Sequence, residues 1–275
     1  MAPRHSKASD DQPTQGTHYS ESLARGLAVL KAFDRQAPLQ TVGEIADRTG
    51  ISRAAARRFL LTLQDLGYVG INGNQFFLTP LVLDIGYKYL ASADITFLVQ
   101  PLLNELAEKT NEAATLAVLD GLDCLVVARA TKRDWDISVG SGSRLPATRT
   151  SLGLVLLAYL PGPQQRSTIA ALRSATPNAD AFNKRLAQVR VDGFAKVQHD
   201  LIPGWSALAL PINGPEGQVA AAINISSYDE TASKKSALDG FRPLLEQAKL
   251  QIEMALRAAP IPLRFGRPPA PPSTK

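Results

Sequence analysis

Apolar residues near the start of the chain recur at helical spacing. Intervals of four, three and three residues separate Leu23, Leu27, Leu30 and Phe33. Positions at these intervals lie on one face of an α-helix. The pattern predicts a first helix from residue 20 to about residue 34.

Capping signals define the next two helices. Thr41 and Glu44 have the spacing of a capping box, in which each side chain accepts a hydrogen bond from the backbone N–H of the other residue. A second helix therefore begins there and ends near Gly50, which can adopt a positive φ at the helix end. Ser52 can cap a third helix, expected over residues 52–66.

A hairpin signal follows the third helix. Two β-type runs, residues 68–71 and 75–78, flank the turn sequence Asn72-Gly73-Asn74. The order of helix, capped helix, short turn, helix and hairpin is typical of a winged helix-turn-helix. Thr79-Pro80 then begins a linker helix expected over residues 81–93, and a further amphipathic helix is expected over residues 97–109.

The second half of the chain mixes strand and helix patterns. Strand-like runs cover residues 113–119, 122–130, 137–139, 194–198, 207–212 and 218–225. Helical patterns cover residues 151–160, 164–174, 179–191 and 236–256. Because helices fall both between and outside the strands, an antiparallel sheet flanked by helices is favoured over a doubly wound parallel sheet. The predicted fold class is α+β.

Length and composition indicate two domains between polar tails. A chain of 275 residues is longer than a domain with a single hydrophobic core usually is. The expected boundaries are a disordered tail at 1–18, the winged helix-turn-helix at 19–80, the linker helix at 81–93, a larger domain at 94–258 and a disordered Pro-rich tail at 259–275.

Composition also limits the kinds of site. The longest apolar run, residues 154–160, is too short to span a bilayer, and the N-terminus lacks the apolar stretch of a secretory signal. We therefore expect a cytoplasmic protein with no membrane contact. The single Cys124 cannot form an internal disulfide, and three widely spread histidines form no zinc pattern, so no metal or other cofactor is expected.

The predicted third helix has one apolar and one cationic face. On a helical wheel, Ala56, Phe59, Leu60 and Leu63 gather on one side, whereas Ala54, Arg57, Arg58 and Leu61 lie on the other. Residues 51–64 contain three arginines and no acidic residue. Arginine can donate two hydrogen bonds to guanine or pair with phosphate. The residues predicted to contact DNA are Thr41, Ser52, Arg53, Ala54, Arg57 and Arg58.

Two other interpretations of this helix remain open. The arginines of a purely structural three-helix unit would simply be solvated, and a winged helix can also serve protein–protein contacts. The net charge of +5 does not decide between them, because the basic excess is spread over both halves of the chain. Salt-dependent DNA binding would distinguish a regulator from a protein-contact module.

Several motifs resemble the DNA-binding domain of the IclR family. They are Ser22-Leu23-Ala24-Arg25-Gly26-Leu27, Glu44-Ile45-Ala46, residues 50–58, Leu66-Gly67-Tyr68-Val69 and Phe77-Leu78-Thr79-Pro80. The run Ala-Ala-Ala-Arg-Arg-Phe-Leu-Leu-Thr-Leu points to the subgroup that governs protocatechuate, 4-hydroxybenzoate and β-ketoadipate catabolism. Residues 142–146, 150–153, 193–194 and 220–224 extend the resemblance over residues 20–257.

The resemblance implies a transcriptional regulator with a GAF-like effector-binding domain. It also implies dimers or dimers of dimers, double-stranded operator DNA with inverted half-sites, and a small organic acid effector, either an aromatic acid or a dicarboxylate. Carried over by position, the effector site comprises Arg149, Thr150, Ser151, Leu152, Ala207, Asn224 and Ser226, with a looser match at Trp135 and Ile137.

Two candidate effector residues have alternative interpretations. An inward Arg149 would pair with a carboxylate, whereas an outward one would be solvated. His199 could bind the effector or serve a structural role. Whether the effector activates or represses stays open, because both outcomes follow from the same coupling between domains.

A hydrolase is a further alternative that the sequence disfavours. Ser151, His199 and Asp200 are the residue types of a catalytic triad, but adjacent His and Asp cannot easily take triad geometry. The chain also contains no Gly-x-Ser-x-Gly nucleophile elbow. We therefore expect no enzyme.

Overall fold

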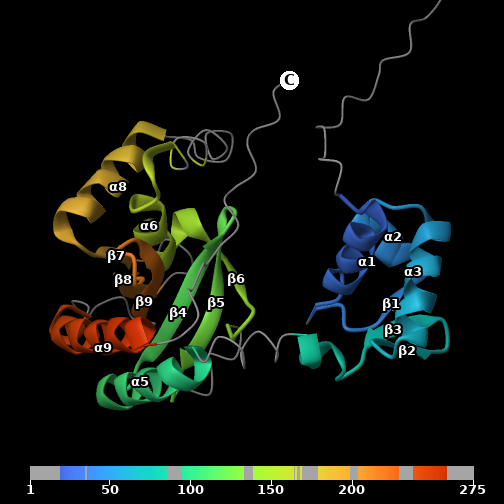
Figure 1. Ribbon diagram of the computed structural model, residues 1–275, viewed down its shortest axis with the longest axis horizontal. Helices are drawn as coiled ribbons and strands as arrows, with labels where there is room; N and C mark the ends of the chain where they lie inside the picture. Colours follow the sequence, from blue (N-terminus) through green and yellow to red (C-terminus); the bar gives the residue numbers. More distant parts are fainter. Residues whose placement is uncertain are drawn as a thin grey trace, which may run out of the picture. The chain divides into compact units, whose positions relative to one another are not determined.

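The chain folds into two units that divide after residue 89 (Figure 1). The computed structural model describes residues 19–34, 36–85, 95–132, 139–163, 165, 168, 179–198, 204–228 and 238–258. None of the helices in these ranges is long and apolar enough to cross a membrane.

The first unit contains three helices and a small sheet. Its elements are α1 (Glu21–Lys31), β1 (Gln40–Thr41), α2 (Val42–Thr49), α3 (Arg53–Asp65), β2 (Val69–Asn72) and β3 (Gln75–Leu78). The sheet is antiparallel in the order β1-β3-β2. Val29, Ile45, Ala56 and Leu60 form the centre of a core that all three helices share. The predicted winged helix-turn-helix is confirmed.

The predicted helix caps are present. Thr41 Oγ1 accepts from the backbone N–H of Glu44, and the Glu44 carboxylate accepts from the Thr41 N–H at 2.7 Å. Gly50 ends α2 at a φ of 69°. Ser52 Oγ accepts from the N–H of Ala55 at 3.2 Å and so caps α3. Local side-chain chemistry thus fixes the turn between α2 and α3.

The first helix and its apolar face differ from the prediction. It ends at Lys31 rather than near Asp34, whose carboxylate accepts from the N–H groups of Gln36 and Ala37, each at 2.8 Å, and so stabilises a turn. Leu23 and Leu27 are exposed, at 65% and 44%. Of the four predicted positions, Leu30 and Phe33 do pack in the core, and the buried face of the helix centres on Val29.

The hairpin is confirmed, with its turn at a slightly different place. Asn72 and Gln75 are register partners, so the two-residue loop is Gly73-Asn74, with Gly73 at a φ of 62°. The two-residue strand β1 was not predicted, because it is too short to produce an alternating pattern.

Removing the Thr41 cap should destabilise the first unit. In Thr41→Ala the N–H of Glu44 loses its acceptor, and the free energy of unfolding should fall by about 1 kcal/mol. Hydrogen bonds from Thr41 also lower the pKa of Glu44, so the box contributes fully near neutral pH and less as the pH falls through that pKa. Urea unfolding is the measurement, and Thr41→Ser, which keeps the hydroxyl, is the control. Equal losses in both variants would contradict the prediction.

The second unit is built on a six-stranded antiparallel sheet. The strands are β4 (Ala113–Asp120), β5 (Asp123–Ala130), β6 (Arg144–Pro146), β7 (Ala195–Gln198), β8 (Trp205–Asn213) and β9 (Val219–Tyr228), in the order β6-β5-β4-β9-β8-β7. The helices are α5 (Ile95–Thr110), η1 (Ala147–Arg149), α6 (Ser151–Ala158), α8 (Ala179–Asp192) and α9 (Leu238–Ala258). The predicted α+β class with an antiparallel sheet flanked by helices is confirmed.

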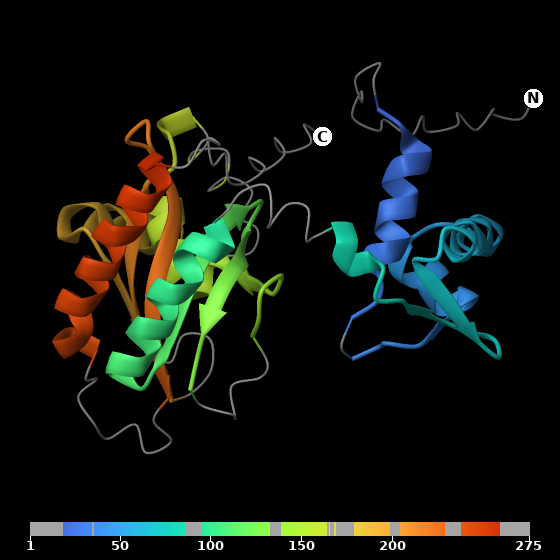
Figure 2. The ribbon, with the colours of Figure 1, turned by 60° about the horizontal axis from the view of Figure 1, so that its bottom comes forward.

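The two faces of this sheet carry different side chains. On one face α5 and α9 lie side by side over residues such as Leu116, Leu208 and Ile223 (Figure 2). The opposite face, towards α6 and α8, bears the smaller Ala209 and Ala222. Because side chains alternate along a strand, the two faces carry different sets of residues, and each set packs against its own pair of helices.

Some predicted elements fall on parts of the chain outside the described ranges. Residue 81 lies in a turn, residues 82–85 are helical, and residues 86–93 of the expected linker lie beyond the described residues. Most of the helix expected at 164–174 and two of three residues of the strand expected at 137–139 also lie outside; Val139 is not in a strand. The described strand β6 was not predicted, because Pro146 interrupts its pattern.

Candidate functional site

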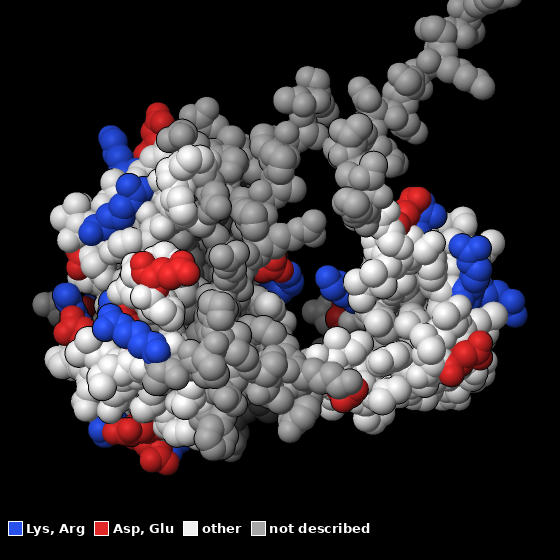
Figure 3. All heavy atoms as spheres, in the orientation of Figure 1, with Lys and Arg blue, Asp and Glu red and all other residues white. Residues whose placement is uncertain are grey.

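Helix α3 presents basic side chains away from the core of the first unit. Arg53, Arg57 and Arg58 are exposed, whereas Ala56 and Leu60 beneath them are fully buried. Within the described part of the chain, no carboxylate pairs with these arginines. Figure 3 shows Lys and Arg side chains grouped on the side of the first unit where α3 runs. The outward face of α3 is therefore a cationic surface.

Two of these arginines have neighbours that orient them. The Arg53 guanidinium lies over the start of α2, where a methyl group added to Gly43 would meet its Nη2 at 3.6 Å. The Arg58 Cζ lies 5.6 Å from the centre of the Phe59 ring, a cation–π contact. Arg57 lies between them in sequence and has no such contact among the described residues.

The other residues predicted to contact DNA border the same surface. Ala54 is exposed beside Arg53 in the first turn of α3. Thr41 and Ser52 are the N-cap residues of α2 and α3, and both hydroxyls accept hydrogen bonds at those caps. The starts of two helices thus adjoin the arginines, and helix N-termini attract anions such as phosphate.

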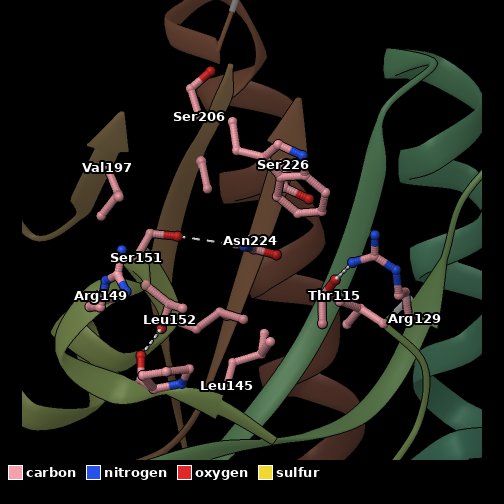
Figure 4. Close-up of a pocket in the computed structure, with 15 residues that line it drawn as sticks. Thr115, Arg129, Leu145, Arg149, Ser151, Leu152, Val197, Ser206, Asn224 and Ser226 are labelled. Carbon is pink, nitrogen blue, oxygen red and sulfur yellow. Dashed lines mark hydrogen bonds between the residues drawn. The ribbon is translucent and has the colours of Figure 1, made fainter. Parts of the chain in front are cut away.

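A pocket of about 350 Å³ lies between the sheet of the second unit and the start of α6 (Figure 4). Strands β4, β5, β7, β8 and β9 contribute to its walls, together with the segment from β6 through η1 into α6. The lining residues are Thr115, Arg129, Val139, Leu145, Pro146, Arg149, Thr150, Ser151, Leu152, Val197, Trp205, Ser206, Ala207, Asn224 and Ser226.

The pocket brings together most of the predicted effector residues. Those that line it are Arg149, Thr150, Ser151, Leu152, Ala207, Asn224 and Ser226. Trp135, Ile137 and His199 lie outside the described residues. Arg149 is exposed although it lines the pocket, so it lies at the rim.

Sequence reasoning missed the pocket residues of the neighbouring strands. The most informative are Thr115, Arg129, Val197 and Trp205. Thr115 and Arg129 are polar residues inside apolar strand patterns, which was a usable signal. These two residues lie beside Asn224 only because β4 pairs with both β5 and β9. The sequence of one strand does not reveal which strands it pairs with.

The first turn of α6 is held by hydrogen bonds of Thr150. Its Oγ1 accepts from the N–H of Gly153 at 3.1 Å and donates to the carbonyl of Pro146 at 3.3 Å. The Cys124 sulfur lies 3.6 Å from the same oxygen, and burial raises the pKa of the Cys124 thiol to about 12. The cysteine is therefore neutral at physiological pH and packs as an apolar group.

Hydrogen bonds also join polar groups of the pocket walls. Asn224 Nδ2 donates to Ser151 Oγ at 3.4 Å. Arg129 Nη1 donates to Thr115 Oγ1 at 2.7 Å. Burial lowers the pKa of Arg129 to about 10, so the guanidinium stays charged at neutral pH. The pocket thus combines apolar walls with a cation and several hydrogen-bonding groups, which suits a small organic anion.

Two family models match the two units of the chain. The IclR helix-turn-helix domain matches residues 22–70. The model described as bacterial transcriptional regulator IclR C-terminal matches residues 87–254. Together they cover both the cationic helix and the pocket.

Individual proteins match over most of their length. The chain is 37% identical over 235 residues to the Pca regulon regulatory protein of Pseudomonas putida, covering 82% of this chain and 81% of the relative. It is 34% identical over 255 residues to the p-hydroxybenzoate hydroxylase transcriptional activator of Acinetobacter baylyi, covering 88% and 93%. A solved structure from Rhodococcus sp. RHA1 matches with a TM-score of 0.73 and 37% identity, covering 87% and 99%.

Proposed function

We propose, from the premise that this chain belongs to the IclR family of bacterial transcriptional regulators, that α3 binds operator DNA and that an aromatic acid in the pocket alters this binding. The chain is a transcriptional regulator of the type that controls protocatechuate and 4-hydroxybenzoate catabolism. The observation that carries the proposal is the cationic face of α3 above a buried apolar underside.

The proposed DNA contact uses the first two turns of α3. In a winged helix-turn-helix the second helix of the motif enters the major groove, where arginine can bind guanine or phosphate. Arg53 and Arg57 project from these turns, with Arg58 adjacent. Thr41, Ser52 and Ala54 border them and complete the proposed contact surface.

The exposed leucines of α1 support a homo-oligomer. Leu23 and Leu27 lie one helical turn apart and are both exposed within the first unit. A symmetric dimer could bury this apolar pair and would present two α3 helices to inverted half-sites. We therefore propose that the DNA-binding form is a dimer or a dimer of dimers.

The pocket supports a small aromatic acid as effector. Its volume of about 350 Å³ is at the lower end of the range for small-molecule sites. Arg129 supplies a positive charge, and apolar residues such as Leu152 and Val197 can pack against a ring. The names of two relatives refer to the Pca regulon and to p-hydroxybenzoate hydroxylase, which suggests an acid of the same catabolism.

A thermal-shift panel tests the effector proposal. At a ligand concentration of 100 Kd, binding to the folded state adds about 2.7 kcal/mol of stability, which corresponds to a rise of about 5–10 °C in the melting midpoint for a domain of this size. The panel comprises 4-hydroxybenzoate, protocatechuate, benzoate and β-ketoadipate. We expect the aromatic acids to raise the midpoint, with a shift that grows with concentration. A shift with β-ketoadipate alone would contradict an aromatic effector and favour a dicarboxylate.

A further inference from the structure

We infer that Arg129 and Thr115 bind the carboxylate of the effector and that Asn224 accepts a hydrogen bond from a hydroxyl group of the same molecule. The effector is then a hydroxylated aromatic acid held in one orientation. This inference rests on the proposed function and adds the residues that would recognise each end of the ligand.

The three residues form a row across neighbouring strands. Thr115 in β4 is the register partner of Arg129 in β5 and of Asn224 in β9. Register partners point to the same side of a sheet, and adjacent strands lie about 4.8 Å apart. The three side chains therefore share the pocket face of the sheet, within reach of one small molecule (Figure 4).

Thr115 extends the set of donors around Arg129. Its Oγ1 accepts the hydrogen bond from Arg129 Nη1, and among the described residues its own proton has no acceptor. A hydroxyl has one proton to donate, so the Thr115 O–H is available to a ligand oxygen. A cation and an O–H donor side by side suit a carboxylate, which has two oxygens to be bound.

The charge of Arg129 makes this part of the pocket selective for an anion. Arg129 lines the pocket, and its Nε and Nη2 atoms are buried. Charge–charge attraction is stronger where water is excluded than at an exposed surface. A neutral ligand of the same shape would lack that attraction and would therefore bind more weakly.

Asn224 offers a buried acceptor without a described donor beside this anion site. The residue is only 6% exposed, and its Nδ2 is bonded to Ser151. Its Oδ1 is buried and receives no hydrogen bond from the described residues. A buried acceptor without a donor is unfavourable, so a ligand hydroxyl that donates to Oδ1 is favoured over a hydrogen atom at the same ring position.

The rim residue Arg149 is a weaker candidate for the carboxylate. It is exposed, and an ion pair at an exposed position is screened by water and salt. Arg129 is half-buried and belongs to a strand within the sheet. The inner arginine therefore provides both the stronger attraction and the more fixed position.

Calorimetric titration of the full chain with an acid and its uncharged analogue tests the carboxylate contact. Arg129→Met keeps an apolar side chain but removes the charge. We expect its affinity for 4-hydroxybenzoate to fall about 10- to 100-fold, the range for losing a hydrogen bond to a charged group, and its affinity for 4-hydroxybenzamide to change less than about threefold. Arg257→Met removes an exposed arginine of α9 that does not line the pocket and is the matched control, for which both affinities should stay within about threefold.

A second comparison tests the hydroxyl contact. In the wild-type chain we expect 4-hydroxybenzoate or protocatechuate to bind about tenfold more tightly than benzoate, and Asn224→Leu should abolish that preference while it still binds benzoate. If Asn224→Leu does not fold, Asn224→Asp keeps an oxygen that can accept from the ligand hydroxyl, so the preference for hydroxylated acids should remain, although the added negative charge should weaken all the acids. A preserved preference in Asn224→Leu, or a lost preference in Asn224→Asp, would overturn this part of the inference.

The possible failures are distinguishable. If the wild-type chain binds none of the acids but binds DNA, the effector half of the proposed function fails and this inference fails with it. If the wild type binds the acids and Arg129→Met binds them equally well, or loses acid and amide alike, only the role of Arg129 is wrong. Where Arg129→Met does not fold, Arg129→Lys keeps the charge and should keep the preference for acid over amide; loss of that preference would overturn the inference.

Discussion

Alanine at Arg53, Arg57 and Arg58 together should abolish specific DNA binding by this regulator. Removing a side chain that reads a base weakens binding by about 1–3 kcal/mol, and removing one that binds a phosphate reduces the slope of log affinity against log salt concentration by about one. Arg57→Ala alone should therefore weaken binding by about 1–3 kcal/mol if Arg57 reads a base. The triple variant should lose more, because the three side chains share one exposed helix face.

Fluorescence anisotropy with the DNA upstream of the gene for this chain, over a series of salt concentrations, is the measurement. Lys184→Ala removes an exposed charge from α8 and is the control, for which affinity and salt slope should stay at the wild-type values. The stoichiometry of the complex should be two chains, or four, per operator. Wild-type affinity in the triple variant would refute α3 as the DNA-binding helix.

Gly153→Ala should unfold or severely weaken the second unit. A methyl group at this position would overlap the Ala147 backbone, including its carbonyl oxygen, and backbone cannot move aside as a flexible side chain can. We expect the free energy of unfolding to fall by about 3 kcal/mol or more, towards the upper end for overpacking. Since η1 and the first turn of α6 line the pocket, effector binding should be lost as well.

Scanning calorimetry distinguishes a local effect from a general one. Gly240 lies in α9 with open space around its Cα and no positive φ. Gly240→Ala should therefore be neutral or stabilise the chain by about 0.5–1 kcal/mol, because alanine is the better helix former. The transition of the first unit, where resolved, should be unchanged in both variants. A wild-type melting profile for Gly153→Ala would contradict the close packing of η1 on α6.

The features predicted correctly from the sequence are those that local chemistry determines. The Thr41–Glu44 capping box and the left-handed Gly50 depend on residues within a few positions of each other. Strand and helix periods likewise depend on neighbours in sequence, and they were sufficient for the α+β class. Family motifs then supplied seven of the fifteen residues that line the pocket.

The features that were missed depend on partners distant in sequence. Leu23 and Leu27 have the spacing of a core face, but their burial requires a surface that the first unit does not provide. Arg129 enters the pocket because β5 pairs with β4 at Thr115, and this register is a property of the folded sheet. Periodicity along one strand cannot reveal which residue of another strand lies opposite.

The alternation of large and small side chains along the central strands has a consequence for the evolution of ligand preference. In β8, Leu208 and Leu210 anchor the helices α5 and α9, while Ala207 and Ala209 face the other side. A substitution at Ala207 can reshape the chamber without removing any of the contacts that hold α5 and α9 in place. Related proteins can thus diverge in ligand preference through substitutions at every second residue of a strand, while the core contacts on the other face of the sheet are kept.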